Sequence, residues 1–161
     1  AGFSPVHQNI FDMLGEVVVS PDVILHIVAD DTVNFENIKV ENVRWSQKNQ
    51  FKEIAKCDIG LAPLPDDAFT RGKCGYKILQ YAAASLPCVA SPIGVNADYV
   101  QQGVTGFHAT NEHEWLKALE TLIHDKILRR KMGKTARIFS ENFDMDIIGK
   151  RLSKAIKTIN D

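Results

Sequence analysis

Hydrophobic positions along this chain fall into short continuous apolar runs and into longer stretches with apolar residues at helical spacing. Residues 23–29 form a β-branched apolar run, typical of a strand buried on both faces of a parallel sheet. Similar runs predict strands over residues 38–45, 57–64, 87–91 and 105–109. Helical spacing predicts helices over residues 5–19, 47–56 and 97–101, a central helix ending near 84, and helices from 111 onward.

The alternation of strands and helices predicts the fold class. It indicates an α/β fold with a Rossmann-like parallel sheet, right-handed crossovers and helices on both faces. Residues 111–161 are expected to form a helical C-terminal tail of the same domain. The chain has 161 residues, of which 45% are hydrophobic, so it is long enough for one domain with a substantial core.

The segment 70–84 is the candidate binding element, because a glycine-containing loop passes into the central helix after the strand 57–64. Open α/β sheets bind ligands at the carboxyl ends of their strands, and a helix N-terminus attracts anions. Lys73, Lys77 and Gln80 are expected on one stripe of this helix if it extends back to Lys73. A phosphate group would suit that stripe, although solvated lysines on an ordinary amphipathic helix remain the alternative.

The composition of the chain limits the kinds of partner and compartment that are expected for the protein. The formal net charge of −1 argues against nucleic acid, and no apolar run approaches the roughly 20 residues of a membrane span. The first residues do not resemble a signal peptide, so a cytoplasmic protein is expected. Three cysteines without metal-ligand spacing indicate a reducing compartment and no metal site. Cys57 and Cys88 are expected to be buried, and Cys74 to be a small loop residue.

Other polar residues have structural explanations. His26 lies within a predicted strand and is interpreted as a hydrogen-bonded core histidine rather than a catalyst. Asp144 and Asp146 have the spacing of a metal-binding pair, but their place at a predicted helix start favours a helix cap. The predicted helix 47–56 carries Phe51, Ile54 and Ala55 on one side.

Six basic residues lie within positions 126–137. A solvated helix face explains them, and contact with a membrane surface or another anionic partner is the open alternative. The residues are Lys126, Arg129, Arg130, Lys131, Lys134 and Arg137.

Four segments carry a family resemblance, namely 57–66, 71–83, 86–94 and 103–107. They resemble the C-terminal half of group 1 glycosyltransferases, which belong to glycosyltransferase family 4 and have the GT-B fold. The resemblance implies one of two Rossmann-like lobes, the lobe that binds a nucleotide-sugar donor. It also implies that the N-terminal acceptor lobe is not encoded here and that the first strand of the donor lobe is truncated.

The family carries a Glu-x7-Glu motif across the loop and the central helix, and its second glutamate binds the donor ribose. Gln80 occupies that second position and can still hydrogen-bond a hydroxyl group. Gly72 replaces the first glutamate, which helps to hold the transferred sugar, and Arg71, Lys73 and Asp67 are candidates to substitute for it.

Lys77 matches a lysine of the family motif, and the resemblance makes Lys77 and Lys73 the expected catalytic residues that neutralise the leaving diphosphate. Residues 93–96 resemble a second loop of the donor site. Trp45 is expected near the base, with a core aromatic as an equal alternative. The expected donor-binding residues are Arg71, Gly72, Gly75, Tyr76, Gln80, Gly94, Val95, Asn96 and Trp45.

The resemblance implies transfer of a sugar from a nucleotide-sugar to a hydroxyl acceptor in glycan biosynthesis, with no metal or other cofactor and with retention of configuration. The fragment alone is expected to be inactive. The alternatives are a nucleotide-sugar 2-epimerase of the same architecture and a receiver-like signalling module suggested by Asp30 and Asp31 after the first strand. A P-loop and a dinucleotide fingerprint are excluded because neither glycine pattern occurs.

Overall fold

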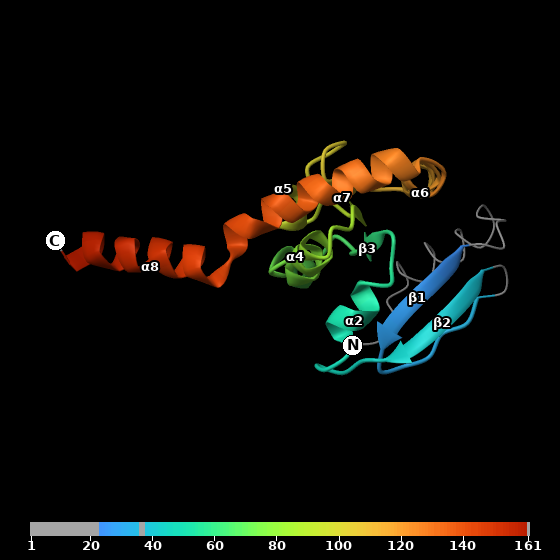
Figure 1. The fold of residues 1–161 in the computed structure, drawn as a ribbon, viewed down its shortest axis with the longest axis horizontal. Helices are drawn as coiled ribbons and strands as arrows, with labels where there is room; N and C mark the ends of the chain where they lie inside the picture. The colour runs from blue at the N-terminus through green and yellow to red at the C-terminus, as the bar shows by residue number, and fades with distance from the viewer. Residues whose placement is uncertain (1–22, 36–37, 161) are drawn as a thin grey trace.

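The computed structural model describes residues 23–35 and 38–160. The helix expected over residues 5–19 lies outside these residues. Strands and helices alternate, as the sequence predicts, and the C-terminal region is helical (Figure 1). In chain order the elements are β1 (Ile24–Ala29), β2 (Lys39–Arg44), α2 (Gln50–Ile54), β3 (Gly60–Ala62), α3 (Ala68–Arg71), α4 (Tyr76–Ala83), β4 (Cys88–Ala90), α5 (Asn96–Tyr99), β5 (Gly106–His108), α6 (Glu112–His124), α7 (Lys126–Ser140), the 3₁₀ turn η1 (Glu141–Phe143) and α8 (Met145–Asn160).

Every described strand pair is parallel, which confirms the predicted α/β class. β1 pairs with β2 in a register that places Ile24 opposite Lys39, and β4 pairs with β3 on one side and β5 on the other. Among the described residues the strands therefore form two hydrogen-bonded groups, β1-β2 and β3-β4-β5. The carboxyl ends of β3, β4 and β5 lie at one edge of their group, because all three strands run in the same direction.

A shared hydrophobic core joins the two groups of strands. Leu25 and Ile27 of β1 belong to the same buried cluster as Val89 of β4 and Trp115 and Leu122 of α6. Val89, Trp115 and Leu122 are essentially inaccessible to solvent. Burial of large apolar side chains is the dominant favourable contribution to folding, so this cluster holds β1 and β2 against the rest of the molecule.

α7 packs closely against the turn that precedes β4. A Cβ atom at Gly133 would overlap the carbonyl oxygen of Ser85, while Met132 and Ala136 on the same helix are buried. Of the six basic residues predicted as a solvated face, all but Arg129 are exposed, which confirms that interpretation for Lys126, Arg130, Lys131, Lys134 and Arg137. Arg129 is partly buried, and both Arg129 and Arg137 donate to main-chain carbonyl groups of neighbouring segments, at 2.6 Å in each case.

α8 extends away from the body of the molecule (Figure 1). Its start confirms the predicted helix cap, because the Asp144 carboxylate accepts a hydrogen bond from the Asp146 amide at 2.9 Å. Phe143, just before α8, packs edge-on against Tyr99 with the ring centroids 5.0 Å apart. No helix in the described part of the chain is long and apolar enough to span a membrane.

Two local predictions were wrong. The segment before Gly72 was expected to be a loop, yet residues 68–71 form the helical turn α3, which a capping box between Asp67 and Thr70 closes. Four residues are too few to produce a helical period in the sequence. Cys57 was expected to be buried and is only partly buried, whereas Cys88 is buried as expected.

Candidate functional site

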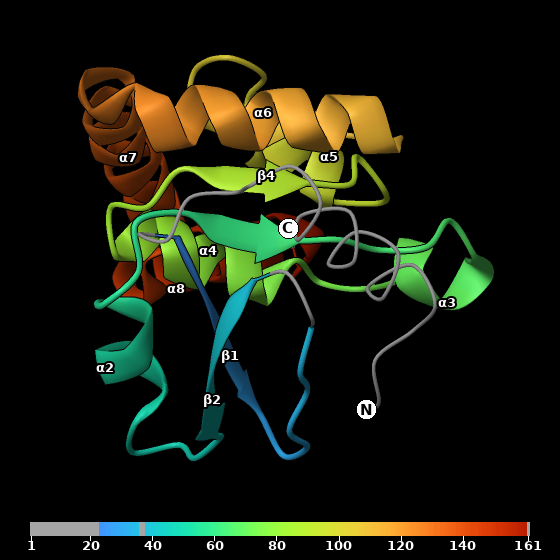
Figure 2. The same ribbon diagram turned by 90° about the vertical axis from the view of Figure 1, so that its right-hand side faces the viewer.

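The candidate site lies where the chain leaves the carboxyl ends of β3 and β4. After β3 the chain runs outward through α3, which lies beyond the tip of the β3 arrow, and then returns to begin α4 (Figure 2). After β4 it turns through residues 91–95 into α5. Both loops therefore leave the same edge of the strand group, the edge at which α/β proteins bind ligands.

Gly75 fixes the start of α4. It is the N-cap residue and has the left-handed backbone conformation, with φ at +62°. A Cβ atom at this position would lie 2.9 Å from side-chain atoms of both Val95 and Tyr99. The first turn of α4 is thus packed directly against the second loop and α5.

Gly94 brings the second loop onto the first. Its φ is +56°, and a Cβ atom there would lie 2.5 Å from the carbonyl oxygen of Arg71. Asn96, two residues later, is buried, and Val95 is half-buried. Tertiary packing consequently brings together most of the predicted donor-binding residues, namely Arg71, Gly72, Gly75, Tyr76, Gly94, Val95 and Asn96.

The two lysines do not share a helix. Because α4 begins at Tyr76, Lys77 lies in its first turn and Lys73 precedes it, so the predicted stripe of Lys73, Lys77 and Gln80 is wrong. The left-handed conformation of Gly75 interrupts the helical path between the two lysines. The ammonium group of Lys73 lies 5.2 Å from the centroid of the Phe69 ring, within the range of a cation–π contact.

The electrostatic environment of Lys77 is unusual for a lysine. Its residue is exposed overall, yet its pKa is lowered, first by desolvation and second by the positive charge of Lys73. Both causes disfavour the charged ammonium group. An anion bound beside the two lysines would oppose both effects, so the start of α4 is electrostatically suited to a phosphate.

Arg71 and Gly72 occupy the turn between α3 and α4. The Arg71 guanidinium makes a bidentate contact with the Asp66 carboxylate at 2.7 and 3.1 Å, and this hydrogen bonding lowers the pKa of Asp66. Gly72 has an ordinary helical conformation with φ at −87°. A Cβ atom there would come no closer than 3.6 Å to another atom, so the turn has room for a larger residue.

Gln80 contacts α2, and Trp45 lies in the segment between β2 and α2. The Gln80 amide donates to the side chain of Gln50 at 3.3 Å, a partner that the sequence pattern did not indicate. Trp45 follows β2, and its backbone amide donates to the Ala29 carbonyl at 3.0 Å. Its side chain is 48% exposed, which rules out the alternative that Trp45 is a core aromatic.

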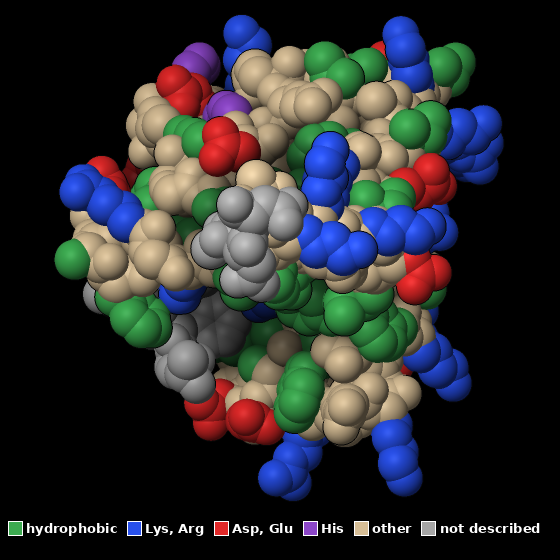
Figure 3. Space-filling view, turned by 90° about the vertical axis from the view of Figure 1, so that its left-hand side faces the viewer, with side chains coloured by type: hydrophobic (Ala, Val, Ile, Leu, Met, Phe, Trp, Pro, Cys, Tyr) green, Lys and Arg blue, Asp and Glu red, His purple; other side chains and the backbone are tan. Residues whose placement is uncertain are grey.

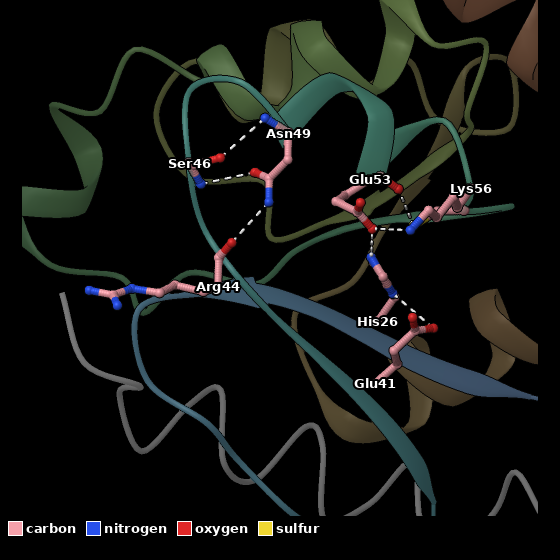
Figure 4. A network of polar contacts seen from close by, with 8 residues as sticks. His26, Glu41, Arg44, Ser46, Asn49, Glu53 and Lys56 are labelled. Atoms are coloured by element: carbon pink, nitrogen blue, oxygen red, sulfur yellow. Dashed lines mark hydrogen bonds and ion pairs between the residues drawn. The ribbon is translucent and has the colours of Figure 1, made fainter.

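Sequence reasoning also missed the polar residues that hold α2. His26 is nearly buried, and its two ring nitrogens lie 3.1 Å from Glu53 and 3.3 Å from Glu41, which confirms its interpretation as a hydrogen-bonded core histidine (Figure 4). Of the residues of α2, Glu53 is buried, whereas Phe51 from the apolar side of the predicted helix is 59% exposed. The sequence pattern gives no sign that Glu53 is buried, because its histidine partner is 27 residues away along the chain.

In the described parts of the chain, no group of three histidine, cysteine or acidic residues is arranged to hold a metal ion. The buried groups beneath α4 have a structural explanation. The Tyr81 hydroxyl donates to the Leu61 carbonyl at 3.3 Å, and burial raises the pKa of both Tyr81 and Cys88. Tyr81 thus holds α4 on β3 as a neutral phenol.

Comparison with solved structures supports the fold. The HepE protein of Anabaena in complex with UDP gives a TM-score of 0.68 at 20% identity, and its complex with UDP-glucose gives 0.66 at 21%. Each match covers 98% of this chain and 47% of the HepE chain. A third HepE structure, with UDP and glucose, matches over 75% of this chain with a TM-score of 0.58 at 23% identity. No curated protein sequence gives a significant match.

The chain therefore spans less than half the length of the HepE structures that it resembles. At the level of sequence families, the model for glycosyl transferases group 1 matches residues 9–125, which is well over half of the chain. That range contains β1 to β5 and both loops at the carboxyl ends of β3 and β4. The chain thus belongs to the group 1 glycosyltransferases.

Proposed function

We propose that this chain is the donor-binding half of a glycosyltransferase that moves a sugar from a nucleoside diphosphate to a hydroxyl acceptor. The observation that carries the proposal is the packing of Gly94 on the Arg71 carbonyl, which places the second loop beside the first turn of α4. Family membership favours this activity over a receiver-like signalling module. It favours the activity over an epimerase less strongly, because both reactions use the same donor.

In this proposal the diphosphate binds at the start of α4. The positive N-terminal end of α4 and the ammonium group of Lys77 would face the negative charge that builds up as the diphosphate leaves. Lys73 adds a second positive charge from the preceding turn. The proposal includes a transfer that proceeds without a metal ion and with retention of configuration, as the family resemblance implies.

The remaining parts of the donor have candidate partners on the α2 side. Gln80 is proposed to bind a ribose hydroxyl, and the exposed ring of Trp45 is proposed to stack on a base. Asn96, buried at the start of α5, is proposed to face the diphosphate or the sugar. Since HepE was crystallised with UDP and with UDP-glucose, uridine nucleotides are the first ligands to test.

We further propose that residues 1–161 form a single donor-binding domain and that the acceptor site belongs to another part of the enzyme. α8 supports this division. It carries exposed apolar side chains on a helix that extends from the body, and basic side chains spread around the same end of the molecule (Figure 3). The exposed apolar residues are Met145, Ile147, Ile148, Leu152 and Ile156.

Such a stripe is expected to be covered by the other lobe. An anionic membrane surface is the second candidate partner for the basic residues of α7 and α8. The proposal places the enzyme in the cytoplasm, and it expects the 161-residue polypeptide alone to bind nucleotide without transferring sugar. Turnover of any nucleotide-sugar by this polypeptide would contradict that expectation.

Calorimetric titration with UDP, GDP, ADP and their sugars tests the proposed donor site. Lys77→Ala should weaken binding of the preferred nucleotide by about 1.5–3 kcal/mol, the scale of a charged hydrogen bond. Lys117→Ala, at an exposed lysine of α6, is the matched control and should leave the affinity unchanged. Equal affinities of the wild type and Lys77→Ala would remove Lys77 from the site.

A further inference from the structure

Phe69 is an exposed aromatic residue at the edge of the strand group where the donor site is proposed. It belongs to α3, which lies beyond the tip of β3 (Figure 2), and it is 77% exposed. A single exposed apolar side chain needs no explanation by itself. The ammonium group of Lys73, however, lies over this ring, 5.2 Å from its centroid. The contact joins the ring to one of the two lysines proposed to bind the diphosphate.

The turn that carries Phe69 is fixed at both ends. At its start, the Asp67 carboxylate accepts a hydrogen bond from the Thr70 amide at 2.8 Å as part of the capping box, and Thr70 is buried. At its end, the second loop packs on the Arg71 carbonyl through Gly94. α3 therefore presents the Phe69 ring from a backbone that the rest of the site holds in place.

Lys73 continues from the same turn. Its backbone amide donates to the Thr70 carbonyl at 3.1 Å, and Gly72 between them has a helical conformation, so the chain follows a helical path as far as Lys73. Residues four positions apart on a helical path are neighbours. The contact between the Lys73 ammonium group and the Phe69 ring therefore follows from the local path of the backbone.

The other charged side chains of this turn already have partners. The Arg71 guanidinium donates to both oxygens of the Asp66 carboxylate, at 2.7 and 3.1 Å. The Asp67 carboxylate closes the start of α3. Within residues 66–73, all of which the structure describes, Lys73 is thus the charged side chain that no hydrogen bond or ion pair occupies. Its ammonium group is available to an anion.

Lys73 is exposed, and its neighbours act on it in opposite directions. The pKa of Lys77 is lowered first by desolvation and second by the charge of Lys73, so the two ammonium groups are close enough to repel one another. The pKa of Asp67 is lowered chiefly by the hydrogen bond from the Thr70 amide and least by the charge of Lys73, so this carboxylate attracts Lys73 only weakly. Attraction to the Phe69 ring opposes the repulsion.

We propose that Phe69 is a positioning residue: its ring holds the Lys73 ammonium group beside Lys77, so that both positive charges are in place when the donor diphosphate binds. The inference rests on the proposed function, since the position of Lys73 matters to a donor only if a diphosphate binds at the start of α4. Ordering a flexible lysine before the ligand arrives lowers the cost of binding. Phe69 acts through Lys73 and does not itself contact the donor.

Proton NMR of the full-length protein without nucleotide tests the contact itself. Protons over the face of an aromatic ring are shifted upfield. The ε-methylene protons of Lys73 should therefore resonate upfield of those of Lys117, an exposed lysine of α6, and Phe69→Leu should remove the difference. Equal shifts of the two lysines in the wild-type protein would overturn the inference.

Nucleotide titrations test the effect on the proposed donor site. The full-length wild type, Phe69→Leu and Phe69→Trp are titrated separately with UDP, GDP and ADP. Phe69→Leu should weaken binding of the preferred diphosphate about twofold to fivefold, the range of a cation–π contact at an exposed site. Phe69→Trp should bind at least as tightly as the wild type, because an indole attracts a cation more strongly than a phenyl ring. An equal loss in both variants would overturn the inference.

Phe51→Leu is the matched control. Phe51 is 59% exposed on α2 and has no cation–π contact with any described residue, so this variant should bind as the wild type does. Both leucine variants should unfold at the wild-type temperature, because the side chains that they replace lie mostly in solvent. An affinity loss in Phe51→Leu equal to that in Phe69→Leu would contradict the assigned role of Phe69.

Lys73→Met tests whether Phe69 acts through Lys73, because it keeps the apolar stem and removes the charge. In the Lys73→Met background the ring has no ammonium group to hold, so adding Phe69→Leu should not weaken binding further. A general structural role of Phe69, or a direct contact with the ligand, would give the same loss in both backgrounds and would overturn the inference.

The outcomes separate the two proposals. Absence of binding of all three diphosphates to the wild-type protein would overturn the proposed function together with this inference. Nucleotide binding that is equal in the wild type and Phe69→Leu would overturn this inference and leave the proposed function intact.

Discussion

Single residues of the two loops decide how closely a ligand can approach the start of α4. Gly75 and Gly94 have positive φ and leave no space for a Cβ atom, so their role is to let the loops pack against one another. Gly72 has neither constraint, so the turn could hold a larger residue at this position.

Replacement of Gly94 tests the packing that carries the proposed function. Gly94→Ala places a methyl group 2.5 Å from the Arg71 carbonyl oxygen. Gly103→Ala is the matched control, because Gly103 also has positive φ but has no atom within 4 Å of the added group. The control should cost about 1–2 kcal/mol from backbone strain, and Gly94→Ala about 1–3 kcal/mol more from overpacking.

Urea denaturation of both variants measures this difference. Nucleotide affinity is measured in parallel, and only Gly94→Ala is expected to lose it, since only that change separates the loops. Equal destabilisation by the two changes would show that the two loops do not pack as described.

Gly72→Glu should be tolerated and should restore a carboxylate to the site. Its effect on the free energy of unfolding is expected to stay within about 0.5 kcal/mol, because the position is exposed and has an ordinary backbone conformation. The added carboxylate should increase the affinity for the nucleotide-sugar relative to the free nucleotide, with Gly72→Ala as the control. An unchanged ratio of the two affinities would place residue 72 away from the sugar.

At the scale of elements, α4 and α7 are positioned by close backbone contacts rather than by side-chain interdigitation alone. α4 lies on β3 through Tyr81, which hydrogen-bonds the Leu61 carbonyl above Gly60. α7 then approaches the turn after α4 at Gly133. A helix approaches a backbone carbonyl this closely only where a glycine removes the intervening Cβ atom.

Two glycines on long helices provide a matched test of the α7 contact. Gly133→Ala should destabilise the protein by about 1–3 kcal/mol, because the methyl group overlaps the Ser85 carbonyl. Gly149→Ala, on exposed α8 with no atom within 4 Å, should stabilise by about 0.5–1 kcal/mol through helix propensity. Thermal unfolding shows whether each variant is more or less stable than the wild type. A stabilising Gly133→Ala would contradict the close packing of α7.

At the scale of the whole molecule, the C-terminal helices differ in how much of their surface is buried. α6 and α7 contribute buried residues to the core, whereas the described side chains of α8 are exposed along its length. Segments with few buried contacts open most readily. The exposed apolar stripe is consistent with a molecule that completes its structure against another lobe.

Hydrogen exchange tests whether another lobe of the enzyme covers α8. In the 161-residue polypeptide, the amides of α8 should exchange faster than those of α6, because α8 makes few contacts with the body. In the complete enzyme, the other lobe should protect α8, while α6 should exchange equally in both proteins. Equal exchange of α8 in the two proteins would show that the rest of the enzyme does not cover it.

The amino-acid sequence by itself determined the alternation of parallel strands and helices, the two loops at the carboxyl ends of β3 and β4, and the family. These follow from local hydrophobic patterns and from motifs that are continuous in the chain. Tertiary structure alone decided that α4 begins after Lys73, that Glu53 is buried while Phe51 is exposed, and that Gln80 meets Gln50. Each of these depends on contacts between segments that are distant in the sequence, and such contacts leave no periodic signal in either segment alone.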